Sequence, residues 1–253
     1  MKRLLVLALV CLPVELAAQD AQNYVMYEAQ YLTPAPGKMA EFSAAMAAHN
    51  KKFHASGPFQ ANVWSILTGP YSGQYSWVMG PCTFTDLDSR PSGADHESDW
   101  AKVVSFTVPM GEEYGEYWRL DADSSYMPDN KIHPILRIRF YDIQRNEGYR
   151  FNRLLEQIKE VYQKKQYPVQ FRVFRNRFFS GSAGRDVATV ATFDKWADLD
   201  RDVSFSDDFE EVHGKGSWRL FMDEISDVVV SAQDELRELM PDLGGGGASS
   251  TDD

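Results

Sequence analysis

The chain contains an internal repeat with an offset of about 112 residues. The matching segments are 86–88 with 198–200 (both Asp-Leu-Asp), 105–110 with 217–222, 127–129 with 240–242 (both Met-Pro-Asp), and Phe42 with Phe151. Self-similarity at one period predicts two copies of a single supersecondary unit. In a chain of 253 residues, each copy is long enough to bury a core of its own.

The two ends of the chain do not fit the repeat. Lys2 and Arg3 precede an apolar run over residues 4–12, and small residues close the segment at Ala18. This order is typical of a secretory signal peptide, and the run is too short to span a bilayer. We therefore expect residues 1–18 to be removed, leaving a periplasmic or secreted protein with no membrane insertion. Residues 244–253 begin with four glycines and predict a disordered tail.

Charge and missing motifs narrow the function. The formal net charge is -11, which argues against a nucleic-acid partner because an acidic surface repels phosphates. The sequence has no Gly-x-Ser-x-Gly elbow, P-loop, dinucleotide fingerprint, His-Glu-x-x-His or Cys/His zinc pattern. A common hydrolase, kinase or zinc enzyme is therefore disfavoured, and we predict no cofactor and no metal.

Hydrophobic periodicity predicts the same element order, β-α-β-β-α-β, in both copies. The expected elements of the first copy are strand 24–32, helix 38–54, strands 59–67 and 74–84, helix 95–106 and strand 116–120. Those of the second copy are strand 135–141, helix 146–165, strands 169–178 and 186–193, helical stretch 205–222 and strand 227–231. This is the order of a ferredoxin-like unit. We predict an α+β fold with two such units in tandem, residues 19–130 and 131–243, each covering the other's open sheet face.

The start of the first copy resembles a known family. Tyr-Glu-Ala-Gln-Tyr at 27–31, followed by Pro-Gly-Lys-Met-Ala-Glu-Phe at 36–42, is similar to the opening of a dimeric α/β-barrel domain of the NIPSNAP or antibiotic-biosynthesis-monooxygenase type. The likeness covers about 20 residues closely, and the second copy lacks the Pro-Gly-Lys. The resemblance implies an intramolecular version of the dimeric α/β barrel. Because that superfamily includes enzymes, haem binders and proteins with no known activity, haem is not excluded.

Histidines are the first candidates for chemistry. His49 lies at the edge of the apolar stripe of the first helix and Asn50 lies within it, so both are candidate catalytic residues if a pocket opens there. The alternative is a structural role at the helix end. His49 and His54 are five residues apart, which does not suit two metal ligands on one helical face. The polar cluster at 95–99, which includes His96, has two interpretations: metal coordination, which carboxylate and imidazole suit, or the preference for acidic residues at a helix start, which we favour.

Aromatic residues and arginines are candidates for ligand binding. Trp64 and Trp77 belong to the central hairpin of the first copy, while Arg172, Arg175 and Arg177 alternate with phenylalanines in the second. One interpretation is a pocket in which an arginine holds a carboxylate beside aromatic walls. The other is a strand with one apolar and one cationic face.

Three functions remain open. The first is an exported soluble protein that binds a small apolar or aromatic acid inside a barrel. The second is a cofactor-independent monooxygenase-like enzyme, with His49 as general base and Asn50 and Trp64 beside it. The third is a structural envelope protein. A homo-oligomer is compatible with each of them.

Overall fold

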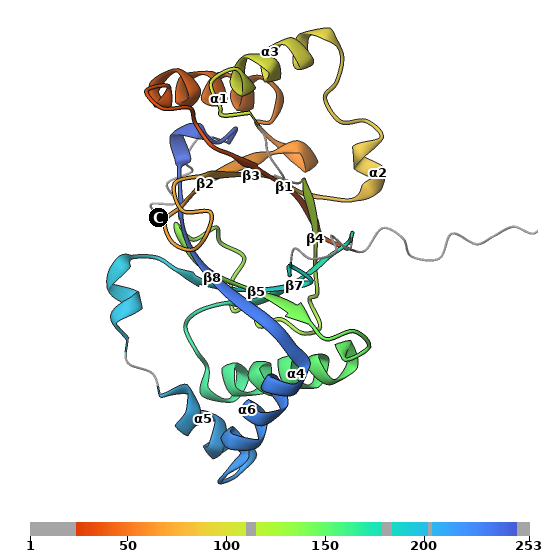
Figure 1. Ribbon diagram of the computed structural model, residues 1–253, viewed down its shortest axis with the longest axis vertical. Helices are drawn as coiled ribbons and strands as arrows, with labels where there is room; N and C mark the ends of the chain where they lie inside the picture. The colour runs from red at the N-terminus through yellow and green to blue at the C-terminus, as the bar shows by residue number, and fades with distance from the viewer. Residues whose placement is uncertain (1–23, 110–114, 179–183, 202–203, 247–253) are drawn as a thin grey trace, which may run out of the picture.

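In the computed structural model, the described strands form one closed antiparallel barrel (Figure 1). The structure describes residues 24–109, 115–178, 184–201 and 204–246. The strands are β1 (Met26–Leu32), β2 (Ala61–Ile66), β3 (Tyr75–Cys82), β4 (Glu116–Leu120), β5 (Ile135–Ile143), β6 (Phe171–Asn176), β7 (Val187–Phe193) and β8 (Val229–Leu239). Around the barrel they follow the order β1-β3-β2-β8-β5-β7-β6-β4.

The two halves of the chain use their strands in the same order. The first four strands lie as β4-β1-β3-β2 and the last four as β8-β5-β7-β6. Two antiparallel seams join the halves: β2 pairs with β8, placing Trp64 opposite Leu239, and β4 pairs with β6, placing Leu120 opposite Phe174. Because both seams are closed, none of these eight strands presents an unpaired edge.

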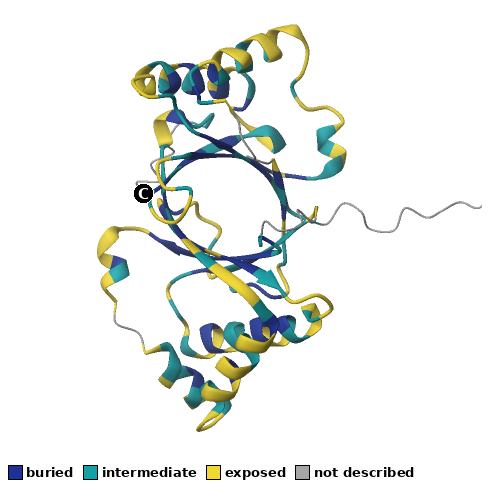
Figure 2. Ribbon diagram, viewed as in Figure 1, coloured by how far each residue is buried: buried dark blue, intermediate teal, exposed yellow. Residues whose placement is uncertain are grey.

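The helices lie outside the barrel, mainly on two opposite sides of it (Figure 1). They are α1 (Met39–Phe53), α2 (Phe84–Leu87), α3 (Ala94–Val104), α4 (Gly148–Lys165), α5 (Phe205–His213) and α6 (Ser217–Val228), with 3-10 turns η1 (Gly57–Phe59), η3 (Trp196–Asp200) and η4 (Pro241–Leu243). Their buried faces point toward the sheet and their exposed faces point outward (Figure 2). Among the described residues, no helix combines the length and the apolarity that crossing a bilayer requires.

Successive side chains of a strand point to opposite sides of the sheet, so the barrel has an inner and an outer set of packed residues. Outward residues such as Val63 pack with Phe42 and Met46 of α1 in the helix layer. Inward residues such as Trp118 and Phe140 pack inside the barrel.

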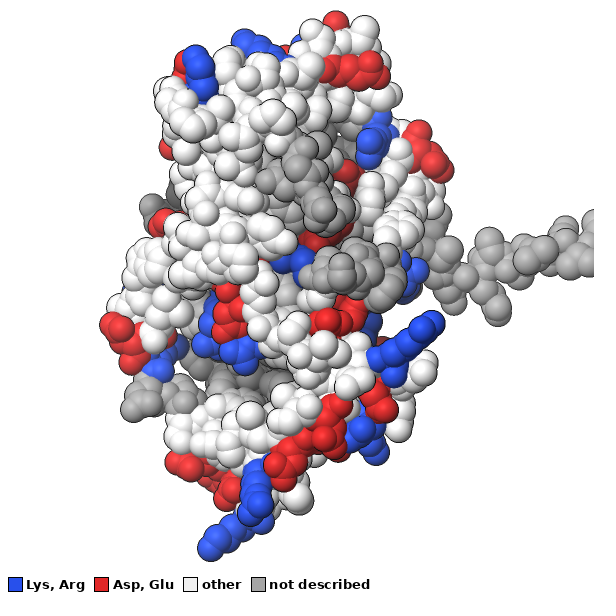
Figure 3. Space-filling view, in the orientation of Figure 1, with Lys and Arg blue, Asp and Glu red and all other residues white. Residues whose placement is uncertain are grey.

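On the face shown in Figure 3, Lys and Arg side chains lie beside Asp and Glu side chains over the second half instead of forming a separate basic surface.

The structure confirms an α+β fold with a closed barrel, but the predicted bounds of the fourth strand of the second half are wrong. The structure ends α6 at Val228 and begins β8 at Val229, so the strand is not residues 227–231. Glu116 pairs with Ala29 and Glu235 with Ile138, and these two pairs occupy the same place in the two halves. The true offset there is 119 residues, from Glu116 to Glu235.

The apolar residues 228–230 lie only at the end of α6 and the start of β8. The rest of the strand turns charged residues toward the barrel interior and carries no such apolar signal, which explains the error. The offset also changes because α6 is an additional helix of the second half. Residues 105–109 follow α3, whereas residues 217–222 lie in α6, so the described part of that sequence match has no structural counterpart. The Asp-Leu-Asp match does have one: Asp86 and Asp198 both accept from a backbone N–H three residues earlier.

The ends of the chain add one difference. The predicted signal peptide lies outside the described residues, as do residues 247–253 of the predicted tail. Residues 244–246 instead pack against the first half, where the Gly245 N–H donates to the Ala61 carbonyl oxygen (2.9 Å). A Cβ at Gly245 would overlap the carbonyl of His54. Glycine at this position therefore permits a close backbone contact.

Candidate functional site

The interior of the barrel contains a cavity of about 610 Å³. This volume lies within the range of small-molecule sites, roughly 300–1,000 Å³. Both halves of the chain supply its walls, which are mainly aromatic and aliphatic; they include Tyr27, Ala29, Trp64, Val78, Trp118, Leu136, Ile138, Phe140, Phe174 and Val190. The cavity thus suits a compact apolar molecule.

A cluster of four charged side chains is buried inside the barrel. Arg185, Arg237, Glu116 and Glu235 are each at most 6% exposed. Arg185 donates from Nε to Glu116 Oε1 (2.7 Å) and from Nη1 to Glu235 Oε1 (3.2 Å). Arg237 donates from Nε to Glu235 Oε2 (2.9 Å) and from Nη1 to Ser76 Oγ (3.0 Å). Two guanidinium groups face two carboxylates, so the buried charges are paired, as their burial requires.

We call these four charged residues the buried tetrad, and Tyr31 is hydrogen-bonded to it. Its hydroxyl accepts from Arg185 Nη2 (2.6 Å) and Arg237 Nη2 (3.2 Å) and donates to Glu116 Oε2 (2.9 Å). Burial raises the pKa of Tyr31 to about 12. Tyr31 and Arg237 also line the cavity. Because the polar atoms of Tyr31 and Arg237 are already hydrogen-bonded within the protein, these two residues form a fixed polar part of the cavity wall.

Arg172 differs from the tetrad because its guanidinium is poorly partnered. It points into the cavity from β6, and within the described part of the chain its Nη2 donates only to the Lys131 carbonyl oxygen, at 3.4 Å. Its Nε is buried and has no hydrogen-bond partner among the described residues. Burial lowers the pKa of Arg172, against the opposing influence of Tyr27 and Asp129.

Thr192, on the strand that pairs with β6, lines the same cavity as Arg172 and is also unsatisfied. Arg172 pairs with Val190 on β7, two residues from Thr192, and both Val190 and Thr192 line the cavity. The Thr192 Oγ1 is buried without a hydrogen-bond partner among the described residues. Buried polar atoms are normally hydrogen-bonded, so two orphans on one wall mark a place where a polar ligand group fits.

The structure separates the other residues predicted for ligand binding. Trp64 lines the cavity, but Trp77 faces the helix layer, with its ring 5.7 Å from that of Trp100. Arg172 and Arg175 are three positions apart and so point to opposite faces of β6. Arg175 donates to Asp121 and Asn152 outside the cavity. Arg177 follows β6 and is exposed. The expected cationic face is therefore absent, and only Arg172 of the three faces the interior.

The two predicted catalytic residues lie in the helix layer, outside the barrel. Asn50 donates from Nδ2 to the Leu243 carbonyl oxygen (2.6 Å) and accepts from Trp77 Nε1 (2.8 Å), which ties α1 to η4 and β3. His49 is fully buried, with its Nδ1 3.1 Å from Asp99 Oδ1. The sheet therefore separates His49 and Asn50 from Trp64, and the three do not line one pocket.

Sequence reasoning missed the buried tetrad and one histidine of the cavity wall. His133 lines the cavity, and its Nδ1 and Nε2 lie 2.8 Å from Asp194 and 3.1 Å from Asp129. Haem iron takes a protein side chain, most often histidine, as an axial ligand. Both nitrogens of His133 are already engaged by carboxylates. His133 therefore offers no free ring nitrogen to haem iron.

No protein-family model matches the chain, and no curated protein matches its sequence. Solved structures do match its fold. An anthrone oxidase-like protein aligns with a TM-score of 0.55 at 12% identity, covering 87% of this chain and 93% of that one. A candidate monooxygenase from Lactobacillus acidophilus aligns at 0.52 and 10% identity, covering 88% and 97%. Chlorite dismutase from Candidatus Nitrospira defluvii aligns at 0.51 and 8% identity, covering 86% and 92%. At identities of 8–12%, these likenesses show a shared fold.

Proposed function

We propose that this chain is an exported protein whose barrel, built from two tandem ferredoxin-like units, binds a small aromatic or apolar acid. The identical strand order of the two halves supports the tandem units. A relationship to proteins of the NIPSNAP type is also part of this proposal, because no protein-family model matches the chain. A homo-oligomeric state also belongs to it.

The observation that carries the proposal is the unpartnered Nε of Arg172 inside an apolar cavity. A buried cationic donor with no partner costs free energy, and a ligand carboxylate would remove that cost with a charge-assisted hydrogen bond. Thr192 Oγ1 on the neighbouring strand offers a second contact for the same group. The preference is for an anion because the four charges of the tetrad already pair with one another.

The walls determine the rest of the ligand. Tyr27 and Phe174 meet edge to face with ring centroids 5.9 Å apart, and Trp118 and Phe140 meet at 5.6 Å. Aromatic surfaces of this kind favour a flat apolar ligand body that they can contact by face or edge. A carboxylate joined directly to one or two rings would place its charge at Arg172 and its rings between these residues.

The test uses 2-naphthoate as the probe and the quenching of tryptophan fluorescence as the readout. We expect Arg172→Gln to weaken binding about 10- to 150-fold, which corresponds to a hydrogen bond to a charged group of about 1.5–3 kcal/mol. Arg177→Gln is the matched control, because Arg177 is exposed beyond the same strand, and it should bind like the wild type. The methyl ester of 2-naphthoate, which has no charge, should bind wild type and Arg172→Gln with equal affinity. Equal affinity of wild type and Arg172→Gln for 2-naphthoate would contradict the proposal.

A second candidate is the cofactor-independent monooxygenase, favoured by the fold likeness to candidate monooxygenases. His49 cannot serve as its base from outside the cavity, so the reacting groups would be those of the cavity wall. Incubation of the protein with a hydroxylated naphthalene in air, followed by mass spectrometry, tests this function. Incorporation of oxygen that depends on the folded protein supports it, and recovery of unchanged probe argues against it.

A further inference from the structure

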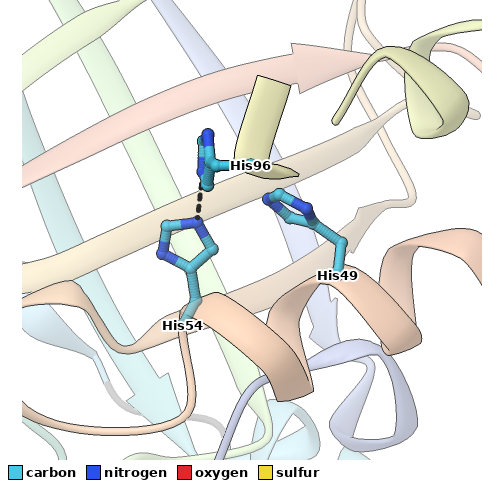
Figure 4. A group of neighbouring side chains, drawn as sticks. All are labelled: His49, His54 and His96. Carbon is cyan, nitrogen blue, oxygen red and sulfur yellow. Dashed lines mark hydrogen bonds between the residues drawn. The ribbon is translucent and has the colours of Figure 1, made fainter. Parts of the chain in front are cut away.

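Three histidines meet in the helix layer of the first half, outside the barrel and away from the proposed ligand cavity. His49 belongs to α1, His54 follows the end of α1, and His96 belongs to α3. One side-chain nitrogen from each lies within 4.8 Å of the others. Figure 4 shows the rings of His49 and His54 directed toward that of His96, and the His54 and His96 Nε2 atoms are 3.4 Å apart.

The spacing of five residues between His49 and His54 does not prevent this arrangement. His54 is the C-cap residue that follows α1, and its φ of -129° and ψ of 34° lie outside the helical region. Leaving the helix turns its side chain back toward the face that carries His49. The expectation that these two histidines cannot act together assumed a regular helix, and the structure corrects it.

The hydrogen bonds around the cluster orient two of the three imidazoles. His54 Nδ1 lies 2.9 Å from the Phe59 carbonyl oxygen, and His49 Nδ1 lies 3.1 Å from the Asp99 carboxylate. Both oxygens only accept hydrogen bonds, so each Nδ1 carries the hydrogen and each Nε2 presents a lone pair toward the cluster. This is the outer-shell arrangement of metal-binding histidines, in which a carboxylate or carbonyl holds the other ring nitrogen.

One of these lone pairs has nothing to bind within the protein. His49 is fully buried, and its Nε2 has no hydrogen-bond partner among the described residues. If the cluster were only core packing, this atom would cost the free energy of a buried unsatisfied acceptor. The Phe53 and Trp100 rings, whose centroids lie 5.2 and 5.1 Å from that of His49, pack against this imidazole but make no hydrogen bond to its Nε2.

We propose that His49, His54 and His96 bind a divalent first-row transition metal of the zinc type through their Nε2 atoms. With Zn–N bonds of about 2.0–2.1 Å, tetrahedral ligands lie roughly 3.3–3.4 Å apart, which is the His54–His96 separation. The third nitrogen has to move inward by about 1 Å or more for the same geometry, a shift that side-chain torsions supply. Imidazole is a preferred ligand for zinc, copper and nickel.

The environment suits neutral imidazole ligands. His49 and His54 are 0% and 4% exposed, and burial disfavours the charged form of an imidazole. Asp99 supplies a nearby negative charge. His96 is the least buried of the three and lies toward the surface. Three protein ligands leave the fourth tetrahedral position for water, and His96 marks its solvent side.

The test uses tag-free, full-length protein dialysed against a chelator and then titrated with Zn²⁺ and with Co²⁺. We expect one equivalent of Zn²⁺ by calorimetry and the intense visible absorption of tetrahedral Co²⁺. Co²⁺ should also quench the fluorescence of Trp77 and Trp100. His96→Gln should lower the affinity for Zn²⁺ at least 10-fold, and circular dichroism will show whether it folds like the wild type.

Two further variants complete the design. His213→Gln is the matched control: this histidine is also partly buried, next to the Gln157 carbonyl of α4, and its loss should leave Zn²⁺ binding unchanged. Asp99→Asn keeps the three ligands and should lower the affinity about 10- to 100-fold by weakening the orientation of His49. An octahedral Co²⁺ spectrum in the wild type, or unchanged Zn²⁺ affinity in His96→Gln, would overturn the proposal. Because this site lies outside the cavity, 2-naphthoate binding should not depend on the metal.

Discussion

Replacing Glu235 with Gln should strongly destabilise the barrel, because this change removes one charge from the buried tetrad. Glu235 is completely buried and accepts from both arginines of the cluster. Its carboxylate lies 3.2 Å from Arg185 Nη1, 2.9 Å from Arg237 Nε and 2.6 Å from Arg237 Nη2. Gln has nearly the same shape, so the variant changes charge more than packing.

The magnitude follows from the charge balance of the tetrad. Wild type has two positive and two negative groups, and Glu235→Gln leaves two guanidinium groups facing Glu116 alone. Breaking a buried ion pair by removing one partner costs about 3–5 kcal/mol, since the other charge stays buried and unpaired. Domains are typically stable by only about 5–15 kcal/mol, so we expect the variant to lose a large share of its free energy of unfolding.

Urea denaturation followed by circular dichroism measures this loss. The midpoint should fall while the denaturant slope stays the same, because the surface exposed on unfolding is unchanged. Glu238→Gln on the same strand is the control, since Glu238 is only partly buried. A loss for Glu235→Gln below about 1 kcal/mol, comparable to that of an exposed ion pair, would refute the reasoning.

A double-mutant cycle with Arg237→Met separates charge from packing. Arg237→Met alone leaves the cluster with a net negative charge, while the double variant is neutral again and retains the Arg185–Glu116 pair. We expect the double variant to lose less than the sum of the two single losses, by on the order of 1–3 kcal/mol. Simple additivity would show that the two side chains do not share one network.

Two further predictions concern buried hydrogen bonds. Asn50→Leu leaves Trp77 Nε1 and the Leu243 carbonyl unpaired, so we expect a loss of about 1–3 kcal/mol for each group, measured by urea denaturation; a neutral result would mean that water replaces Asn50. Tyr31 ionises at about pH 12 in the folded state and near pH 10 when unfolded, so above pH 10 the unfolded chain releases a proton that the fold retains. The free energy of unfolding should therefore fall between about pH 10 and 12, and Tyr31→Phe should show a shallower fall.

Much of the fold was within reach of the sequence. The stripe on α1 and the apolar strands of both halves are local patterns, and each reports which face of an element is buried. The repeat added the information that both halves use the same elements. The prediction of β8 failed because that strand turns Glu235 and Arg237 toward the barrel interior. Its sequence therefore lacks the alternation of apolar and polar residues by which a strand is recognised.

The candidate site was much less predictable. Arg172 and Trp64 were named from the sequence, but the Arg175 and Arg177 assignments failed because residues an odd number of positions apart on a strand face opposite sides. The tetrad joins residues 69 and 154 positions apart, Arg185 with Glu116 and with Tyr31. No local pattern encodes such partners.

The sequence by itself determined most of the helices and strands of each half and their order, because the periodicity of apolar residues reflects which face of each element is buried. Only the tertiary structure decided which polar side chains meet. Closing the barrel along the β2–β8 and β4–β6 seams brings Glu116 and Glu235 to one arginine. Packing α3 on α1 brings His96 to His49 and His54. These contacts depend on the register and packing of distant segments, which is a property of the folded chain as a whole.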